Sequence, residues 1–509
     1  MSAHYLLGID AGTSVIKSVI FDLAGHELIS ASQETTLLHP APTFSEQDMH
    51  EVWNAVFATA KEAIQQLGKP NQIAAIGVTG QGDGTWLIDA NHQPVRPAIL
   101  WLDGRSADFV RQGQQNGLSD ELFRITGTAL NTSNQAAQLR WLLDHEPQAL
   151  NRAKAALRAK DWIFLNLTGL VRSDETDASH TYFTTTSRKI DPRILELFGL
   201  ASYAHLLPEI KSAAGNVGSL LPAIAEGLGL PTAIPVVGGP FDVVASDLGV
   251  GMLATGDACT ILGTAGIHQL VLDGTVQGDM GYTMCHAPAD RLLRLLPTMT
   301  GTLNLQWFVD QFFSHEQTSF KQNGAKASNS NLWDELEALA ATIPPGCDGV
   351  MYHPYIDPAG ERAPFVRPEA RAQFTGISAR HSRAHLLRAV YEGVVLSAMD
   401  CYDKLGAPVT ALKLAGGGAR SKLWCQLFAD ALGCEVQVAE GSEFGAKGAA
   451  INAAVAIGLY PSYEAAIAQT VRPARSYQPD TTKTQFYRKW LKIYRETYEA
   501  MFPIWNKRI

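Results

Sequence analysis

The sequence predicts an α/β protein built from two related halves, and three observations indicate this. Apolar segments bounded by Gly or Asn alternate with amphipathic helical patterns, which is typical of sheets flanked by helices. The opening pattern of strand, Gly-Thr turn and strand at residues 5–25 returns at residues 258–274. The 509 residues exceed the roughly 250–300 at which a single hydrophobic core stops growing. We therefore expect a duplication with a boundary near residue 250.

Composition narrows the class of protein. With 46% hydrophobic and 18% charged residues, the chain is neither disordered nor collagen-like. The net charge of −9 does not favour a nucleic-acid or anionic-membrane partner. No uncharged apolar run approaches the ~18 residues of a membrane span, and the N-terminus lacks the basic region of a signal peptide. Six cysteines without a CxxC pair predict reduced, buried thiols, no zinc site and a cytoplasmic protein.

The expected elements follow the two halves. In the first half we expect strands at Tyr5–Ile9, Val15–Phe21, His26–Ser30, Ile73–Thr79 and Ile234–Gly239, with helices at Met49–Gln66 and from about Pro240. In the second we expect strands at Ala258–Leu262, Ile267–Leu272 and Ala411–Ala415, a loop at Ser314–Asn331, and helices at Leu423–Leu432 and Thr482–Trp505. Aromatic residues at helical spacing predict that the last helix packs on the protein.

The first turn, Asp10-Ala-Gly-Thr-Ser, is a candidate phosphate cradle. Gly12 permits a tight turn whose N–H groups converge, and Thr13 and Ser14 add hydroxyls. Asp10 would hold a divalent cation through water, and Lys17 would reach a phosphate. The alternative is an ordinary hairpin turn in which Asp10 bonds its own backbone.

Two further glycine turns lie in the second half. Gly263-Thr264 repeats the first turn. Gly416, Gly417 and Gly418 follow an apolar strand and precede Ser421 and a helical pattern, which is typical of an anion or nucleotide platform. The alternative is a tight strand-to-helix connection. The turn is not the full dinucleotide fingerprint, and the sequence contains no P-loop.

Candidate substrate and catalytic residues follow two strands of the first half. Asp242 begins a helix at the carboxyl end of a buried strand, where ligands of open α/β sheets gather, and could accept a hydroxyl proton; the alternative is a helix-start Asp that caps the helix. Gln81 and Asp83 suit several hydroxyl groups. Asp103 and Arg105 would join them, with an internal ion pair as the alternative. We interpret 160–162 and 176–179 as structural.

Taken together, these motifs resemble the FGGY family of carbohydrate kinases in the sugar kinase, Hsp70 and actin superfamily. The resemblance rests on Gly8–Ser14, Leu262-Gly263-Thr264, Gly239-Pro240-Phe241-Asp242, Gly360-Glu361-Arg362-Ala363-Pro364 and Ala415–Ser421, in the family's order. It implies two actin-like (ribonuclease H-like) lobes with a central cleft. The expected division is 1–250 for the N-terminal lobe, 251–456 for the C-terminal lobe and 457–509 for a helical extension.

The resemblance implies an ATP-dependent kinase. Asp242 would be the catalytic base and Asp10 the ligand that orients Mg²⁺. Sugar contacts would come from Gln81, Asp83, Asp103 and Arg105, and nucleotide contacts from Gly12, Thr13, Ser14, Lys17, Gly263, Thr264, Gly416, Gly417, Gly418 and Ser421. Partners would be a sugar or polyol and ATP, without nucleic acid or membrane, and a homodimer is left open.

The substrate is narrowed by a departure from the family. Glycerol kinases carry Gln-Arg-Glu and many xylulokinases Gln-Met-His where this chain has Gln81-Gly82-Asp83. We interpret Gly82 as making room for an acyclic substrate larger than glycerol, with a pentulose such as xylulose first and erythritol or another polyol as the alternative. An actin-like ATPase, or a sugar-binding regulator without kinase activity, is the alternative of another class.

Overall fold

The structure, a computed structural model, describes residues 4–184, 187–274, 280–317 and 332–507. It forms two compact units. The first comprises residues 1–253, 271–293 and 440–472, and the second comprises residues 254–270, 294–439 and 473–509. Both contain a sheet flanked by helices, which confirms the predicted α/β class.

The first unit is built on one mixed sheet. Its strands are β1 (Tyr5–Ala11), β2 (Val15–Asp22), β3 (Glu27–Glu34), β5 (Ile73–Gly80), β11 (Val217–Ser219) and β12 (Pro235–Gly238). Their order is β11-β12-β5-β1-β2-β3. β1, β2 and β3 pair antiparallel, whereas β5 runs parallel to β1 and β12 parallel to β5. The predicted hairpin and both predicted buried strands are confirmed.

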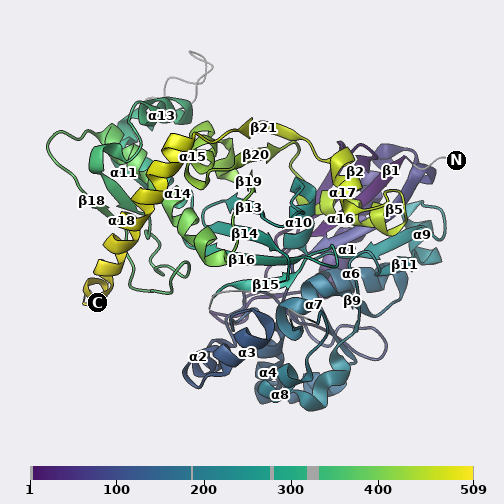
Figure 1. The fold of residues 1–509 in the computed structure, drawn as a ribbon. Helices are drawn as coiled ribbons and strands as arrows, with labels where there is room; N and C mark the ends of the chain where they lie inside the picture. The colour runs from purple at the N-terminus through teal and green to yellow at the C-terminus, as the bar shows by residue number, and fades with distance from the viewer. Residues whose placement is uncertain (1–3, 185–186, 275–279, 318–331, 508–509) are drawn as a thin grey trace. The chain divides into compact units, whose positions relative to one another are not determined.

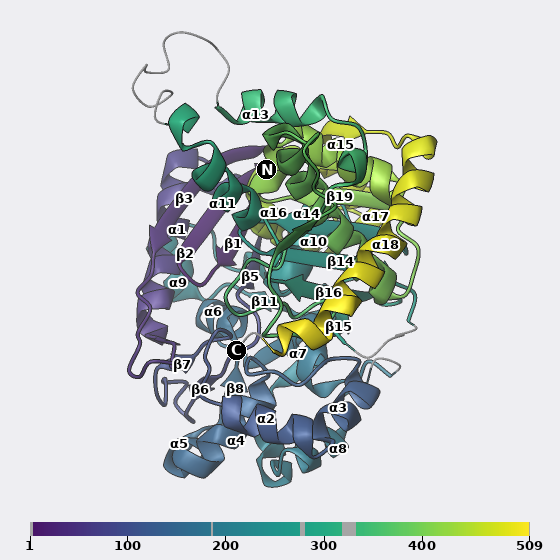
Figure 2. The same cartoon turned by 90° about the vertical axis from the view of Figure 1, so that its left-hand side faces the viewer.

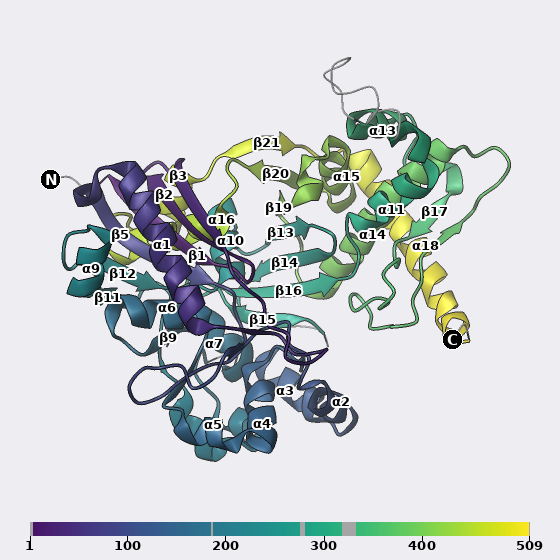
Figure 3. The same ribbon diagram turned by 180° about the vertical axis from the view of Figure 1, so that it is seen from behind.

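Side-chain alternation along β1 assigns the two faces of this sheet. Leu7, Ile9 and Ala11 join the core under α1 (Met49–Leu67) and α6 (Ala159–Thr168), as Figure 3 shows for α1. The intervening residues face α10 (Asp242–Val250) and α16 (Phe444–Ala456), which Figure 1 shows beside β1 and β5. Because side chains alternate with period two, Asp10 lies on the face that α16 covers.

The α16 face is packed backbone against backbone. Gly8 and Gly77 are in register on β1 and β5. A Cβ atom on either would lie 2.1 Å from a carbonyl oxygen of α16, that of Ala446 or Ala449 respectively. A Cβ on Gly448 would lie 1.7 Å from the carbonyl oxygen of Ala245 in α10. Glycine is therefore required at all three positions.

This packing assigns residues 440–472 to the first unit. The sequence interpretation had divided them between the C-terminal lobe and the helical extension. A helix made almost entirely of small apolar residues does not by itself indicate which sheet it covers, and the matching glycines of β1 and β5 supply that information only in three dimensions.

The remaining elements of the first unit are short. Strand pairs are formed by β4 (Glu46–Gln47) with β7 (Ala98–Ile99), β6 (Trp86–Ile88) with β8 (Ala155–Leu157), and β9 (Arg172–Asp174) with β10 (Glu209–Lys211). The helices are α2 (Ala107–Gln115), α3 (Leu118–Thr126), α4 (Gln135–His145), α5 (Pro147–Arg152), α7 (Glu175–Tyr182), α8 (Pro192–Leu197), α9 (Pro222–Leu228) and α17 (Tyr463–Thr470). β15 (Tyr282–Cys285) packs on α7, where Cys285 N donates to Ser179 Oγ at 2.8 Å.

The second unit repeats the central arrangement of the first. Its sheet has the strand order β15-β16-β14-β13-β19-β20-β21. The strands not yet introduced are β16 (Leu292–Thr298), β14 (Gly266–Leu272), β13 (Asp257–Leu262), β19 (Ala411–Ala415), β20 (Glu435–Ala439) and β21 (Pro473–Tyr477). β13 pairs antiparallel with β14 and parallel with β19, just as β1 does with β2 and β5. This shared topology supports the duplication read from the Gly-Thr turns.

Helices surround this second sheet. They are α11 (Leu303–Phe312), α13 (Leu332–Ala341), α14 (Arg383–Leu405), α15 (Lys422–Leu432) and α18 (Thr481–Trp505), with β17 (Met351–His353) and β18 (Gln373–Thr375) as a separate pair. α18 packs on α14 (Figure 2) and buries Tyr494 and Tyr498, so the predicted packed C-terminal helix is confirmed.

Other sequence predictions have mixed outcomes. All six cysteines are free and buried, as expected. None of the described helices is long and apolar enough to span a bilayer. In the predicted loop Ser314–Asn331, residues 314–317 are helical instead, and residues 318–331 lie outside the described residues.

We predict that Gly448→Ala destabilises the protein by about 2 kcal/mol or more, because the new methyl group overlaps the α10 backbone. Thermal unfolding should show a melting temperature lower by about 4 °C or more. Gly417→Ala is the control, because a Cβ there meets no atom within 4 Å and should leave the melting temperature unchanged. Equal melting temperatures for the two variants would contradict the packing described.

Candidate active site

Asp83 lies in the middle of the loop between β5 and β6 and is held there by two side-chain contacts. Its backbone has φ of 54°, an unusual value for a non-glycine residue. Ser133 Oγ donates to one carboxylate oxygen at 2.7 Å, and His180 Nδ1 lies 2.8 Å from the other. The Asp83 side chain is 13% exposed. The two contacts fix a carboxylate that is still accessible to a ligand.

His180 and Asp83 form a charged pair. Burial lowers the pKa of His180, but the neighbouring Asp83 carboxylate outweighs it, so the net pKa is raised. Burial raises the pKa of Asp83, but His180 and Ser133 outweigh it, so the net pKa is lowered. The imidazolium and the carboxylate therefore stabilise each other's charged form.

A buried network of charges lies behind this pair. Arg158 Nε is 2.8 Å from Asp177 Oδ1. Lys160 Nζ is 2.6 Å from Asp161 Oδ1 and 2.5 Å from Asp174 Oδ2. All five side chains are essentially inaccessible to solvent. Asp177 also accepts the Asp83 N–H at 3.4 Å, so the network supports the loop that carries Asp83.

Sequence reasoning missed this network. Residues 160–162 and 176–179 were interpreted as structural polar segments, and their joint location beside Asp83 depends on the pairing of distant segments. The available signal was Lys160-Asp161 directly before the apolar run 162–165, since adjacent charges next to core-type residues indicate a buried ion pair; Asp174 and Asp177 lie in a polar run and carry no such signal.

Asp242 is the first residue of α10, and residues 239–241 connect it to the end of β12. Its Oδ1 accepts the Val243 N–H at 2.7 Å. Burial raises its pKa well above the ordinary carboxyl value, and the nearby carboxylates of Asp10, Asp177 and Asp83 raise it further. The structure thus gathers the predicted catalytic carboxylate, the predicted cation ligand and Asp83 within one region of the first unit.

The space at Gly82 is filled by protein. A Cβ on Gly82 would lie 2.1 Å from two carbon atoms of the Phe241 ring. Phe241 is fixed in turn, because its N–H donates to Thr176 Oγ1 at 3.0 Å. The interpretation that Gly82 makes room for a larger substrate is therefore wrong: the glycine accommodates Phe241 and so places Asp242.

The Gln81 side chain is buried and forms its hydrogen bonds within the protein. It is 2% exposed. Its Oε1 accepts from Thr13 Oγ1 at 3.0 Å, and its Nε2 donates to Gln47 Oε1 at 2.8 Å. The side chain therefore fastens the phosphate turn to β5, and the structure does not present it to a ligand as the sequence interpretation expected.

Asp103 and Arg105 form the internal ion pair that was the alternative interpretation. Arg105 Nε lies 2.8 Å from Asp103 Oδ1, and both side chains are fully buried. Arg105 also pairs with Glu46 at 2.6 Å, while Asp103 accepts the Ser45 N–H. These contacts support the loop after β7, and we assign neither side chain to the substrate.

The candidate phosphate turn of the first unit keeps its backbone donors available. In the described part of the chain, the N–H groups of Thr13 and Ser14 have no acceptor. Burial raises the pKa of Asp10 to about 6, opposed by Lys17. Lys17 Nζ lies 2.8 Å from Glu443 Oε2, so the predicted phosphate ligand is paired with a residue from the segment before α16.

The candidate nucleotide turns of the second unit are also formed. The Gly263 and Thr264 carbonyls accept the N–H groups of Thr302 and Leu303, which fixes that turn. Gly416 has φ of 80° and packs on the backbone of Leu262. Ser421 is the N-cap of α15, where its Oγ accepts the Trp424 N–H at 3.0 Å. Gly416 and Gly417 are exposed.

The donor set for a divalent cation is small. Among the described residues, no group of three or more His, Cys, Asp or Glu side chains could hold a metal. Asp10 has a raised pKa and lies near the Asp242 carboxylate. A nearby positive charge would therefore stabilise the ionised form of Asp10. This fits Mg²⁺ carried mainly by nucleotide phosphates and water.

Known proteins are similar to this chain over nearly its whole length. Residues 5–249 match the N-terminal domain of the FGGY family of carbohydrate kinases, and residues 253–457 match its C-terminal domain. The chain is 35% identical to an erythritol kinase of Brucella abortus (strain 2308), over 99% of this chain and 97% of that protein. It is 30% identical to the L-xylulose/3-keto-L-gulonate kinase of Escherichia coli (strain K12), over 98% and 97%.

A solved structure agrees with these relatives. The xylulose kinase from Rhodospirillum rubrum matches with a TM-score of 0.87 at 26% identity, covering 99% of this chain and 100% of that one. The chain therefore belongs to the FGGY family of carbohydrate kinases and is a carbohydrate kinase.

Proposed function

We propose that this kinase transfers the γ-phosphoryl group of ATP to a terminal hydroxyl of an acyclic polyol, with erythritol as its substrate. The observation that carries the proposal is the pair of Asp83 and Asp242 in the first unit. One carboxylate is held ionised by His180, and the other has a pKa well above the ordinary value. The two environments thus suit Asp83 to hydroxyl binding and Asp242 to proton transfer.

Asp242 is assigned as the general base. Its Oδ1 is engaged by Val243, so Oδ2 takes the proton of the attacking hydroxyl. The hydroxyl oxygen then bonds to the γ-phosphorus while the bond to the β–γ bridging oxygen breaks, which releases ADP. A carboxylate with a raised pKa is a stronger base for this step. Positioning supplies most of the remaining acceleration.

Asp83 is assigned to the other hydroxyl groups of the polyol. A carboxylate accepts hydrogen bonds only, and its fixed oxygens favour hydroxyl donors in one geometry. Thr13 and Ser14 in the first unit, and the Gly263 and Gly416–Gly418 turns in the second, are assigned to ATP. Mg²⁺, held at Asp10 through water, would neutralise phosphate charge.

Erythritol replaces the pentulose that sequence analysis placed first. That order rested partly on extra room at Gly82, and Phe241 fills this space. The relative at 35% identity over 99% of the chain is named an erythritol kinase, whereas the relative named for L-xylulose is 30% identical. Both observations favour the shorter polyol.

We predict that erythritol gives a kcat/KM about tenfold or more above that of any other substrate tested, since a binding site discriminates such analogues by ~1–3 kcal/mol. The measurement is a coupled assay of ADP release with erythritol, both xylulose enantiomers, glycerol and gluconate. The Asp242→Asn variant tests the mechanism and should lower kcat on the order of 10²-fold or more while ATP still binds. A pentulose preferred over erythritol would overturn the substrate. Near-normal turnover of Asp242→Asn would overturn the mechanism.

We also predict that His180→Gln raises KM for the polyol by about tenfold or more, because Asp83 loses a charged hydrogen-bond partner worth ~1.5–3 kcal/mol. KM for ATP should change less than about twofold, since His180 contacts no nucleotide turn. Steady-state kinetics with each substrate varied separately will measure both constants. The exposed His205 provides the control variant, His205→Gln, and equal effects of the two substitutions would contradict the role of the pair.

A further inference from the structure

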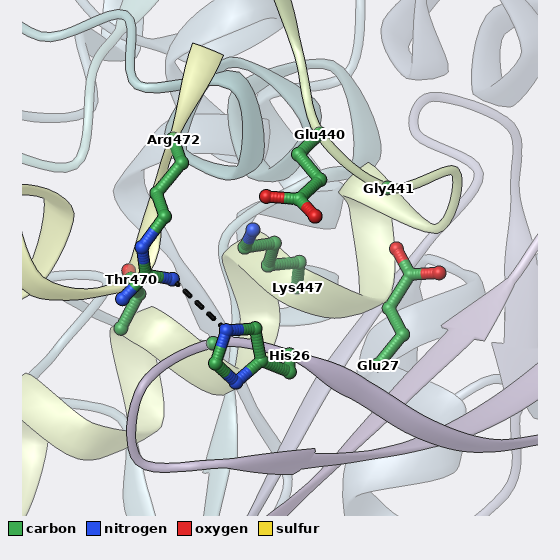
Figure 4. A pocket seen from close by; sticks show the side chains of 8 residues that line it. His26, Glu27, Glu440, Gly441, Lys447, Thr470 and Arg472 are labelled. Carbon is green, nitrogen blue, oxygen red and sulfur yellow. Dashed lines mark hydrogen bonds between the residues drawn. The ribbon is translucent and has the colours of Figure 1, made fainter. Parts of the chain in front are cut away.

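The first unit contains a pocket that the kinase reaction does not use. It has a volume of about 310 Å³, at the small end of the range for small-molecule sites. Its walls come from the β2–β3 turn, from α16 and the segment before it, and from the end of α17, as Figure 4 shows. The lining residues are Gly25, His26, Glu27, Glu440, Gly441, Lys447, Thr470 and Arg472.

Lys447 is the unusual group in this pocket. It is 4% exposed, and in the described part of the chain its ammonium group has no hydrogen-bond or ion-pair partner. Figure 4 shows its Nζ directed into the pocket, between Arg472 and Glu440. Burial lowers the pKa of Lys447. The nearby Glu27 and Glu440 carboxylates oppose this lowering without forming an ion pair with Lys447, and an oxyanion in the pocket would supply the hydrogen-bond acceptor that its Nζ lacks.

Arg472 provides a second, fixed cation. Its Nη1 donates to the Ala24 carbonyl at 2.9 Å and lies 3.4 Å from His26 Nε2, and its Nη2 donates to the Gln469 carbonyl at 3.3 Å. These contacts hold the guanidinium at the wall of the pocket. A phosphate group, with several oxygens, suits two cations that approach from different sides.

The two acids of the pocket differ in availability. Glu27 Oε1 already accepts the N–H groups of Ser442 and Glu443 at 2.8 and 3.0 Å. The exposed Glu440 has no hydrogen bond to its carboxylate among the described residues, although its N–H donates to the Arg472 carbonyl. Glu440 is thus placed to accept hydrogen bonds from hydroxyl groups on a ligand.

The pocket and the Asp10 region lie on different sides of α16. A Cβ on Gly445 would meet Asp10 Oδ2 at 2.2 Å. Lys447 is two residues further on, and at 3.6 residues per turn this places it about 200° around the helix axis. A ligand beside Lys447 therefore does not occupy the phosphate turn.

We propose that this pocket is a second ligand site, for a small molecule that carries a phosphate group and hydroxyl groups. Lys447 and Arg472 bind the phosphate, and Glu440 accepts from the hydroxyls. The phosphate could be free inorganic phosphate or part of a phosphorylated polyol, and the two probes below distinguish these sources. The hydroxyl contacts favour the phosphorylated polyol.

Isothermal titration calorimetry on the full chain tests the site, with saturating ADP present to occupy the phosphate turns. The probes are inorganic phosphate and glycerol 3-phosphate. We expect both to bind, glycerol 3-phosphate at least threefold more tightly, and Lys447→Met to weaken both at least tenfold. Glu440→Gln should remove the difference between the probes.

The controls separate lost binding from misfolding. Lys447→Arg should retain binding, and the exposed Lys492 provides the matched variant Lys492→Met, which should bind as the native chain does. Arg472→Gln should also weaken binding at least tenfold. Unchanged binding by Lys447→Met, or no binding to the native chain, would overturn the site. Equal affinity of the native chain for the two probes would overturn the role of Glu440.

Discussion

The direct packing of α16 on the first sheet is the constraint on which the rest of the first unit depends. Gly8, Gly77 and Gly448 let the backbone of this helix touch β1, β5 and α10 without intervening side chains. Such close contact fixes position more tightly than a layer of side chains, because nothing in it can change rotamer. It places Asp10 and the start of α10 near each other, and the raised pKa of Asp242 is partly a result of that proximity.

The carboxylates around Asp83 are balanced by buried cationic side chains and not by a basic surface. The chain carries a net charge of −9, so in the proposed function phosphate binding would depend on backbone N–H groups, a cation and a few local side chains. Arg158, Lys160 and His180 balance the carboxylates that surround Asp83. Buried ion pairs add little net stability, and here they hold Asp83 in a strained backbone conformation and keep it ionised.

The sequence predicted the fold well and the site only in part. Local patterns are sufficient for α1, for the β1–β2 hairpin and for its repeat at β13–β14, because each depends on neighbouring residues. The return of α16 to the first sheet, the burial of Asp103 with Arg105 and the filling of Gly82 by Phe241 depend on segments far apart in the chain. Their residue types fit both interpretations, and only three-dimensional proximity decides between them.

The central claim is that Asp242 accepts the proton of the attacking hydroxyl, whereas Asp83 binds other hydroxyl groups of the polyol. The most direct measurement is a crystal structure with erythritol and a non-hydrolysable ATP analogue. We predict a terminal hydroxyl within about 2.6–3.2 Å of the Asp242 carboxylate and an inner hydroxyl hydrogen-bonded to Asp83. A polyol bound in the ternary complex without contact to either carboxylate would contradict the account.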